Sequence, residues 1–181
     1  MEKIIRKLLV KLGENPDREG LKRTPERVRK AYEFLTKGYH EDPMKIITGA
    51  VYKEQCNHMI IVKDIEFYSL CEHHLLPFYG NCYIGYIAKN KVYGVSKMAR
   101  VVECFSRRLQ VQERLTQQVA RILMDGINAE GVGVVLEARH LCMMMRGVQK
   151  QNSVMVTSAM LGSFHDDPAT RAEFLNLIRG R

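Results

Sequence analysis

The chain has 181 residues, of which 46% are hydrophobic and 27% charged, a composition that excludes a disordered or fibrous protein and allows one domain with a buried core. The first ten residues show no apolar signal core, and no stretch is long enough to cross a bilayer, so we expect a cytoplasmic protein with no membrane contact. The net charge of +8 fits an anionic partner, but the basic residues are scattered among carboxylates and tryptophan is absent, which argues against nucleic acid.

The first fifty residues are predicted to form two helices. The first covers about residues 3–11 and stops near Gly13. The second begins at Thr24, a suitable N-cap, and Pro25 suits its first turn. Apolar residues then recur with helical spacing at Val28, Ala31, Tyr32 and Leu35. Residues 1–50 are therefore interpreted as an N-terminal helical extension, and residues 51–181 as the main domain of one structural unit.

The main domain begins with residues rich in β-branched and aromatic side chains. Residues 59–67 and 78–87 are predicted strands, and residues 96–105 and 110–124 are predicted helices, the second ending near Asp125-Gly126. Two more strands are predicted over residues 132–142 and 149–161, and a closing helix begins at Asp167-Pro168. The order, with the N-terminal pair, is ααββααββα, which indicates an α+β fold.

Two clusters of sulfur and imidazole groups are the most informative feature. One is Cys71-Glu72-His73-His74, and the other is His140-Leu141-Cys142, too distant from the first for a zinc finger. Together they supply two thiolates and three imidazoles, more than a zinc ion needs. Alternation along residues 132–142 predicts that His140 and Cys142 project from the same, otherwise apolar, face of a strand. A catalytic zinc site keeps one position open, whereas a structural site is closed by four protein ligands. A buried histidine and a buried free cysteine, unrelated to metal, would be the simpler alternative.

The remaining cysteines and histidines carry no such pattern. Without a secretory signal we expect reduced thiols, and we interpret the three cysteines outside the clusters as small buried residues: Cys56, Cys82 and Cys104. The three isolated histidines are predicted to lie on the surface or in turns: His40, His58 and His165.

A series of short motifs along the chain resembles the GTP cyclohydrolase I family. The motifs are Thr24-Pro25-Glu26-Arg27-Val28, Cys71-Glu72-His73-His74 with Pro77-Phe78, Ser96-Lys97-x-x-Arg100, Gln110-Val111-Gln112-Glu113-Arg114-Leu115-Thr116, His140-x-Cys142, Arg146-Gly147, and Thr170 to Leu175. Their order and spacing cover nearly the whole chain. Four positions depart from the expected pattern, none of them a metal or acid–base position: Tyr83, Ala88, Val154 and Met155.

The resemblance implies a tunnelling fold, an antiparallel sheet with helices on one face, in which subunits join their sheets into a barrel. It also implies a homodecamer of two pentamers with active sites at subunit interfaces, and residues 51–181 as the catalytic domain. Oligomer formation would remove exposed sheet edges, which are otherwise a liability.

The resemblance also implies the site residues and the reaction. Zn²⁺ would be held by Cys71, His74 and Cys142, with His73 and His140 as proton shuttles. The triphosphate of GTP would meet Ser96, Lys97, Arg100 and Arg146, while Glu113 accepts hydrogen bonds from guanine and Gln112 contacts the base or holds Glu113. The products would be 7,8-dihydroneopterin triphosphate and formate, with no redox cofactor.

Three other functions remain open from the residues themselves. His140 could join the two cysteines and His74 in a closed structural zinc site of a non-enzymatic protein. Another enzyme of the same fold class, such as a pterin synthase or a nitrile reductase, is the second, although such synthases typically use three histidines. Nucleic-acid binding, suggested by charge alone, is the third.

Overall fold

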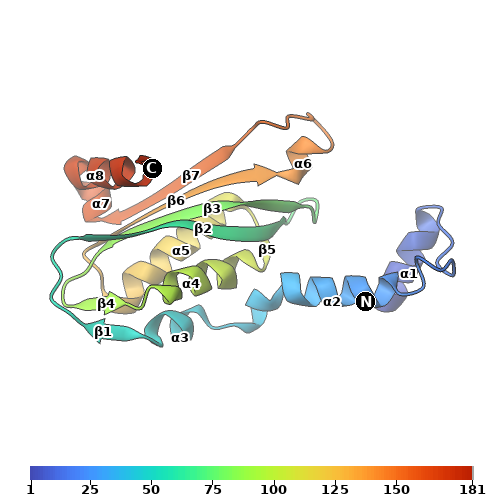
Figure 1. Ribbon diagram of the computed structural model, residues 1–181, viewed down its shortest axis with the longest axis horizontal. Helices are drawn as coiled ribbons and strands as arrows, with labels where there is room; N and C mark the ends of the chain where they lie inside the picture. Colours follow the sequence, from blue (N-terminus) through green and yellow to red (C-terminus); the bar gives the residue numbers. More distant parts are fainter. Residues whose placement is uncertain (181) are drawn as a thin grey trace.

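The computed structural model describes residues 1–180 and contains an α+β fold with two N-terminal helices that extend away from a sheet (Figure 1). Within these residues no helix is long and apolar enough to span a membrane. The elements before the sheet are α1 (Glu2–Lys11), α2 (Thr24–Leu35), the 3₁₀ helix η1 (Lys37–His40) and α3 (Pro43–Thr48). Neither α1 nor α2 has a fully buried residue, so they contribute nothing to the main core.

The main sheet has the strand order β5-β2-β3-β6-β7. All neighbouring strands pair antiparallel except β5 and β2, which are parallel. A separate small sheet pairs β1 with β4. The strands are β1 (Val51–Lys53), β2 (Met59–Cys71), β3 (Pro77–Ile87), β4 (Lys91–Tyr93), β5 (Leu109–Gln110), β6 (Gly131–His140) and β7 (Met155–Gly162).

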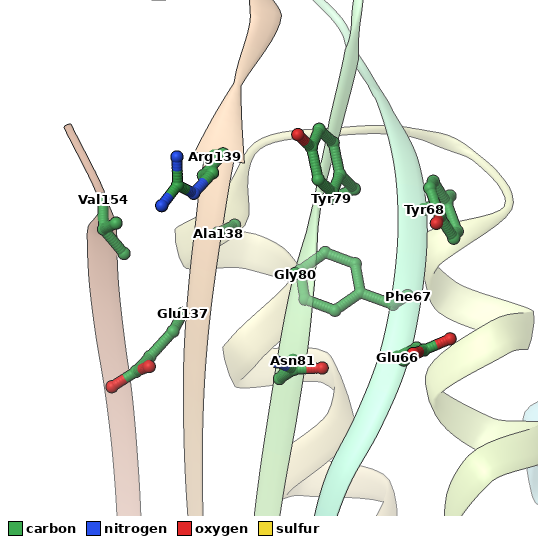
Figure 2. A pocket seen from close by; sticks show the side chains of 10 residues that line it. All are labelled: Glu66, Phe67, Tyr68, Tyr79, Gly80, Asn81, Glu137, Ala138, Arg139 and Val154. Atoms are coloured by element: carbon green, nitrogen blue, oxygen red, sulfur yellow. The ribbon is translucent and has the colours of Figure 1, made fainter. Parts of the chain in front are cut away.

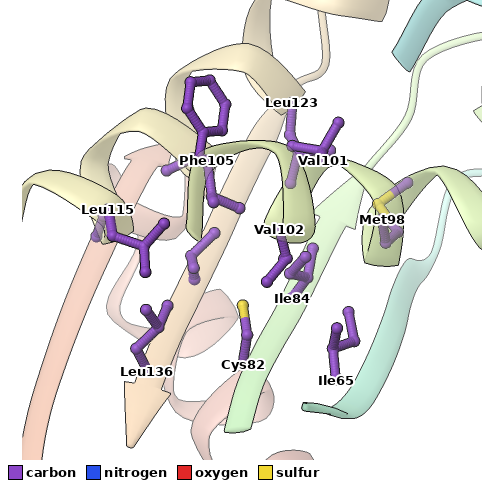
Figure 3. Close-up of a cluster of buried hydrophobic side chains, with 14 of the residues drawn as sticks. Ile65, Cys82, Ile84, Met98, Val101, Val102, Phe105, Leu115, Leu123 and Leu136 are labelled. Carbon is purple, nitrogen blue, oxygen red and sulfur yellow. The ribbon is translucent and has the colours of Figure 1, made fainter. Parts of the chain in front are cut away.

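The principal core lies between one face of this sheet and the helices α4 (Ser96–Ser106) and α5 (Gln112–Ile127). Alternation along β6 directs Val132, Val134 and Leu136 toward this side, where they are fully buried. Figure 3 shows α4 and α5 side chains packed over strand residues such as Cys82 and Ile84. Burial of these apolar residues is the main force that holds the helices to the sheet.

The opposite face of the sheet is covered at one end by α7 (Ser163–Asp166) and α8 (Pro168–Arg179). Phe164 and Phe174 are fully buried there, with ring centroids 5.4 Å apart in an edge-to-face arrangement. Gly133 is required beneath them, because an added Cβ would lie 2.5 Å from Phe164. The prediction of helices on one face only is therefore wrong: α7 and α8 pack on the second face.

Several predicted boundaries also differ from the structure. Helix α2 begins at Thr24 itself, so this residue does not cap it. Helix α5 continues past Asp125-Gly126 and ends before Asn128, whose left-handed conformation terminates it. Strand β7 begins at Met155 rather than Gln149. The short elements β1, β4, β5, η1, α3, α7 and α6 (Leu141–Met144) were not predicted, because so few residues show no periodicity.

The three cysteines outside the clusters are buried and unpaired, as predicted. The isolated histidines His40, His58 and His165 are exposed, also as predicted.

Candidate metal and active site

The first sulfur–imidazole cluster lies in the turn between β2 and β3. Cys71 is the last residue of β2, and its carbonyl accepts hydrogen bonds from the amides of His74 at 3.3 Å and Leu75 at 2.8 Å. Leu75 adopts a positive φ of 55°, which reverses the chain. The turn thereby returns His74 to Cys71, and the Cys71 Sγ lies 3.8 Å from the Nδ1 atoms of both His73 and His74.

The second cluster does not have the predicted strand geometry. Strand β6 ends at His140, and Cys142 lies in the short helix α6 that follows. The two side chains therefore do not project from one strand face. The reason is the change from strand to helix after His140, which directs Cys142 toward Cys71.

Cys71, His74 and Cys142 come together as a group that could hold a metal ion. Their ligand atoms all lie within 4.8 Å of one another, and the three residues are respectively buried, exposed and half-buried. Burial and the neighbouring Cys71 raise the pKa of the Cys142 thiol. Two thiols and an imidazole are a donor set that suits zinc, and three protein ligands leave a position open. The residues present therefore fit a catalytic zinc ion.

The two remaining histidines stand next to this group without belonging to it. His73 is exposed. His140 is half-buried, and its ring lies on that of Phe78 with centroids 4.7 Å apart and planes 2° apart. The pKa of His140 is lowered by burial, while the charge of Glu113 acts in the opposite direction. Both imidazoles are suitable groups for proton transfer.

The start of α5 lies beside the metal-binding group. Glu113 is exposed there, whereas Gln112 is only 1% exposed and its side chain bonds to His140 and to three groups of the protein. Arg146, just beyond α6, is exposed with Nη1 3.3 Å from His74 Nε2. Of the predicted substrate residues, these three lie near the cysteines and histidines.

The other predicted phosphate-binding residues are far from this group. Ser96, Lys97 and Arg100 occupy the beginning of α4, where Lys97 and Arg100 line a groove with residues of η1 and α3. The end of α4 leads through Arg107 and Arg108 to β5, which pairs with Leu70 and Cys71. Helix α4 has 11 residues and is roughly 16 Å long, so its beginning lies a helix length away from its end near β5. The groove that contains Lys97 and Arg100 is lined by none of Cys71, His74 and Cys142. One copy of the chain does not bring them together.

A hollow on the sheet face opposite α4 and α5 contains none of the predicted site residues (Figure 2). It is lined by Glu66, Tyr68, Tyr79, Asn81, Glu137 and Arg139, together with Val154, one of the four departing positions. Tyr68 and Tyr79 stack with centroids 5.7 Å apart. Since Arg139 and His140 alternate along β6, this hollow and the His140 side chain lie on different faces.

The comparison with known proteins decides the family. The family model described as GTP cyclohydrolase I matches residues 1–179. The chain belongs to the GTP cyclohydrolase I family. A GTP cyclohydrolase 1 from Leptospira biflexa is 56% identical over 179 residues, covering 99% of this chain and 98% of that protein. Another from Coxiella burnetii is 56% identical over 175 residues, covering 97% and 95%.

The similarity extends to animals and, weakly, to a solved structure. A GTP cyclohydrolase 1 from Drosophila melanogaster is 56% identical over all of this chain and 56% of that protein. An archaeosine synthase QueF-like structure matches 57% of this chain and 93% of its own, with 14% identity and a TM-score of 0.49. Membership of the GTP cyclohydrolase I family identifies the chain as an enzyme, a GTP-binding hydrolase of pterin and folate biosynthesis.

Sequence reasoning missed the roles of four residues around the site. Arg114 bonds the Glu72 carboxylate, Phe78 stacks on His140, and Thr116 and Thr157 bond to each other near Gln112. The position of Thr116 one helical turn after Gln112 is a local signal that could have been used. Thr157 has no local signal, because it lies in a distant strand.

Proposed function

We propose that the chain converts GTP to 7,8-dihydroneopterin triphosphate and formate with zinc bound by Cys71, His74 and Cys142. The observation that carries this proposal is the three-residue metal-binding group with two histidines beside it that are not part of it. Bound zinc would supply a Lewis acid and acidify water for attack on C8 of guanine.

The chain's own residues supply proton transfer and substrate binding in this proposal. His73 and His140 give and take the several protons that ring opening, rearrangement and ring closure require. Glu113 is exposed near the site and accepts N–H bonds from the guanine edge. Arg146 holds phosphate with its planar guanidinium group.

The separation of Ser96, Lys97 and Arg100 from the metal-binding group supports an active site shared between copies. A second copy would place its α4 beside the first copy's cysteines, so that the triphosphate bridges the two. We therefore propose a tunnelling fold that assembles as a homodecamer of two pentamers, with residues 51–181 as the catalytic domain and residues 1–50 as a helical extension. The cytoplasmic location stays a prediction of the sequence.

The proposed reaction is tested by incubating the zinc-loaded protein with GTP and following formate release together with the fluorescence of the oxidised pterin. Both products are expected. Formate alone would mean that the rearrangement fails. Neither product from folded, zinc-loaded protein would overturn the proposal.

Two variants distinguish this enzyme from a closed structural zinc site. Cys142→Ser is expected to lose zinc and activity together. His140→Ala is expected to keep zinc and lose turnover, since His140 Nε2 is engaged by Gln112. Loss of zinc from His140→Ala would make His140 a ligand and favour the structural site.

A further inference from the structure

The Gln112 side chain is buried next to His140 and links its own helix, α5, to the strands β6 and β7. Its Nε2 lies 3.1 Å from the Leu136 carbonyl of β6, 3.0 Å from the Met155 carbonyl of β7 and 3.1 Å from Thr157 Oγ1. Its Oε1 lies 2.8 Å from His140 Nε2. All four partners belong to the protein, and the residue is 1% exposed.

These partners fix which end of the amide faces His140. Two of the three groups around Nε2 are backbone carbonyls, which only accept hydrogen bonds, so the amide NH₂ must face them. If the amide were reversed, Oε1 would face the Leu136 and Met155 carbonyl oxygens, and none of these three buried acceptors would receive a hydrogen bond from the other two. The atom that meets His140 is therefore the carbonyl oxygen Oε1.

The hydroxyls of Thr116 and Thr157 take part in the same network, and their donor and acceptor roles can be assigned. Thr116 Oγ1 donates to the backbone carbonyl of Gln112 at 2.7 Å, which uses the only proton of this hydroxyl. The 2.7 Å contact between the two hydroxyls then requires Thr157 Oγ1 to donate to Thr116 Oγ1. Thr157 Oγ1 is left to accept from Gln112 Nε2, in agreement with the amide orientation.

The orientation of the amide determines the tautomer of His140. Oε1 can only accept, so His140 Nε2 must carry the proton, and in the neutral ring Nδ1 is then the nitrogen with the free lone pair. Stacking on Phe78 fixes the plane of the ring but would permit a half-turn about the Cβ–Cγ bond, which returns the ring to the same plane. The bond to Gln112 selects one of the two orientations.

We propose that Gln112 is a positioning residue that holds His140 with Nε2–H directed to the protein and Nδ1 left for proton transfer during turnover. This inference rests on the proposed function and assigns Gln112 differently from the expected contact with guanine. Its buried side chain has no role in binding GTP, and its effect on the reaction passes through His140.

The first test reads the tautomer directly in the zinc-loaded protein labelled with ¹⁵N-histidine. Long-range ¹H–¹⁵N correlations at alkaline pH are expected to show His140 with a protonated Nε2 and an unprotonated Nδ1, identified by the signals missing from His140→Ala. A protonated Nδ1 would overturn the proposal. This readout does not depend on turnover, so it stays distinguishable from a failure of the proposed reaction.

The second test separates positioning from substrate binding. Gln112→Met removes both halves of the amide and is expected to lower kcat on the order of 100-fold, with KM for GTP nearly unchanged, because the reacting ring is no longer held. The His140 Nε2–H proton should then exchange rapidly with water. Gln110→Met is the matched control, since Gln110 is equally buried and bonds to Phe105 and Gln118 without touching His140. A raised KM with unchanged kcat in Gln112→Met would overturn the proposal.

If Gln112→Met does not fold, a less disruptive substitution tests the same network. Thr157→Val removes one hydroxyl of the network and leaves the Gln112–His140 bond without one of its supports. It is expected to lower kcat less than Gln112→Met, again with KM nearly unchanged. Wild-type kcat together with a freely exchanging His140 Nε2–H in Thr157→Val would contradict the proposed role.

Discussion

Arg114 on α5 bonds both carboxylate oxygens of Glu72, the residue between Cys71 and His73, at 2.5 and 3.1 Å. The hydrogen bond from Arg114 lowers the pKa of Glu72, which keeps the carboxylate charged. The pair is partly exposed, so its contribution to global stability is small. Its effect is local, because it attaches the turn between β2 and β3 to α5, which also contains Gln112 and Glu113.

Loss of the Arg114–Glu72 ion pair should weaken the retention of zinc by the metal-binding group. Arg114→Ala is expected to release zinc to a chelator about 10-fold faster than the wild type, the scale typical of groups that orient metal ligands. Glu72→Gln should behave alike, and the double variant should be no worse than either single one, because both remove the same interaction. Arg121→Ala, two turns further along α5, is the control. Wild-type release from Arg114→Ala would show that the turn needs no such support.

The distance between the α4 cations and the metal-binding group predicts complementation between copies. Arg100→Ala and Cys142→Ser should each have little activity, and mixing them under conditions that exchange subunits should restore part of it. The control pair is Cys142→Ser with His140→Ala, whose changes lie in one cluster and should not complement. Equal failure of both mixtures, measured by pterin fluorescence after confirmed exchange, would contradict a site shared between copies.

The hydrogen bonds at the start of α8 should lower the pKa of Asp167 below that of an ordinary aspartate. Thr170 Oγ1 donates to its carboxylate at 2.6 Å, and the Ala169 and Thr170 amides donate as well, which lowers the pKa of Asp167. The stabilisation is present above the ordinary pKa of about 3.9 and is lost as pH falls through the lowered value. Thr170→Val is expected to raise the pKa of Asp167 toward the ordinary value in a carboxyl ¹³C titration. Thr48→Val, which removes a hydroxyl bond elsewhere, should leave it unchanged.

Phe174 should account for most of the attachment of α8 to the sheet. Its side chain is fully buried against Phe164, so Phe174→Ala is expected to lower the free energy of unfolding by about 3–5 kcal/mol. Leu177 lies on the same helix but is 49% exposed, and Leu177→Ala should change that energy by less than about 0.5 kcal/mol. Urea unfolding at equal protein and zinc concentrations compares them. Similar losses in the two variants would mean that α8 is not held through Phe174.

Much of the fold could be predicted because its signals are local. The β-branched and aromatic residues of β2 and β3 and the helical stripe of α5 follow from the chain itself. Short elements such as β5 and α6 could not be predicted, since two or four residues have no period. The packing of α8 on the second sheet face was also missed, because the apolar stripe of a helix does not state which surface it meets.

The sequence by itself determined the chemistry available: two thiols, three imidazoles and the motif series that identifies the family. Only the tertiary structure decided how these groups are arranged. It grouped Cys142 with Cys71 and His74, separated Lys97 and Arg100 from them, and buried Gln112 against His140. The physical reason is that a donor set depends on residue type, whereas hydrogen-bond direction and distance arise from contacts between remote segments. Met155, whose carbonyl helps to fix the amide of Gln112, is 43 residues away from it in the chain.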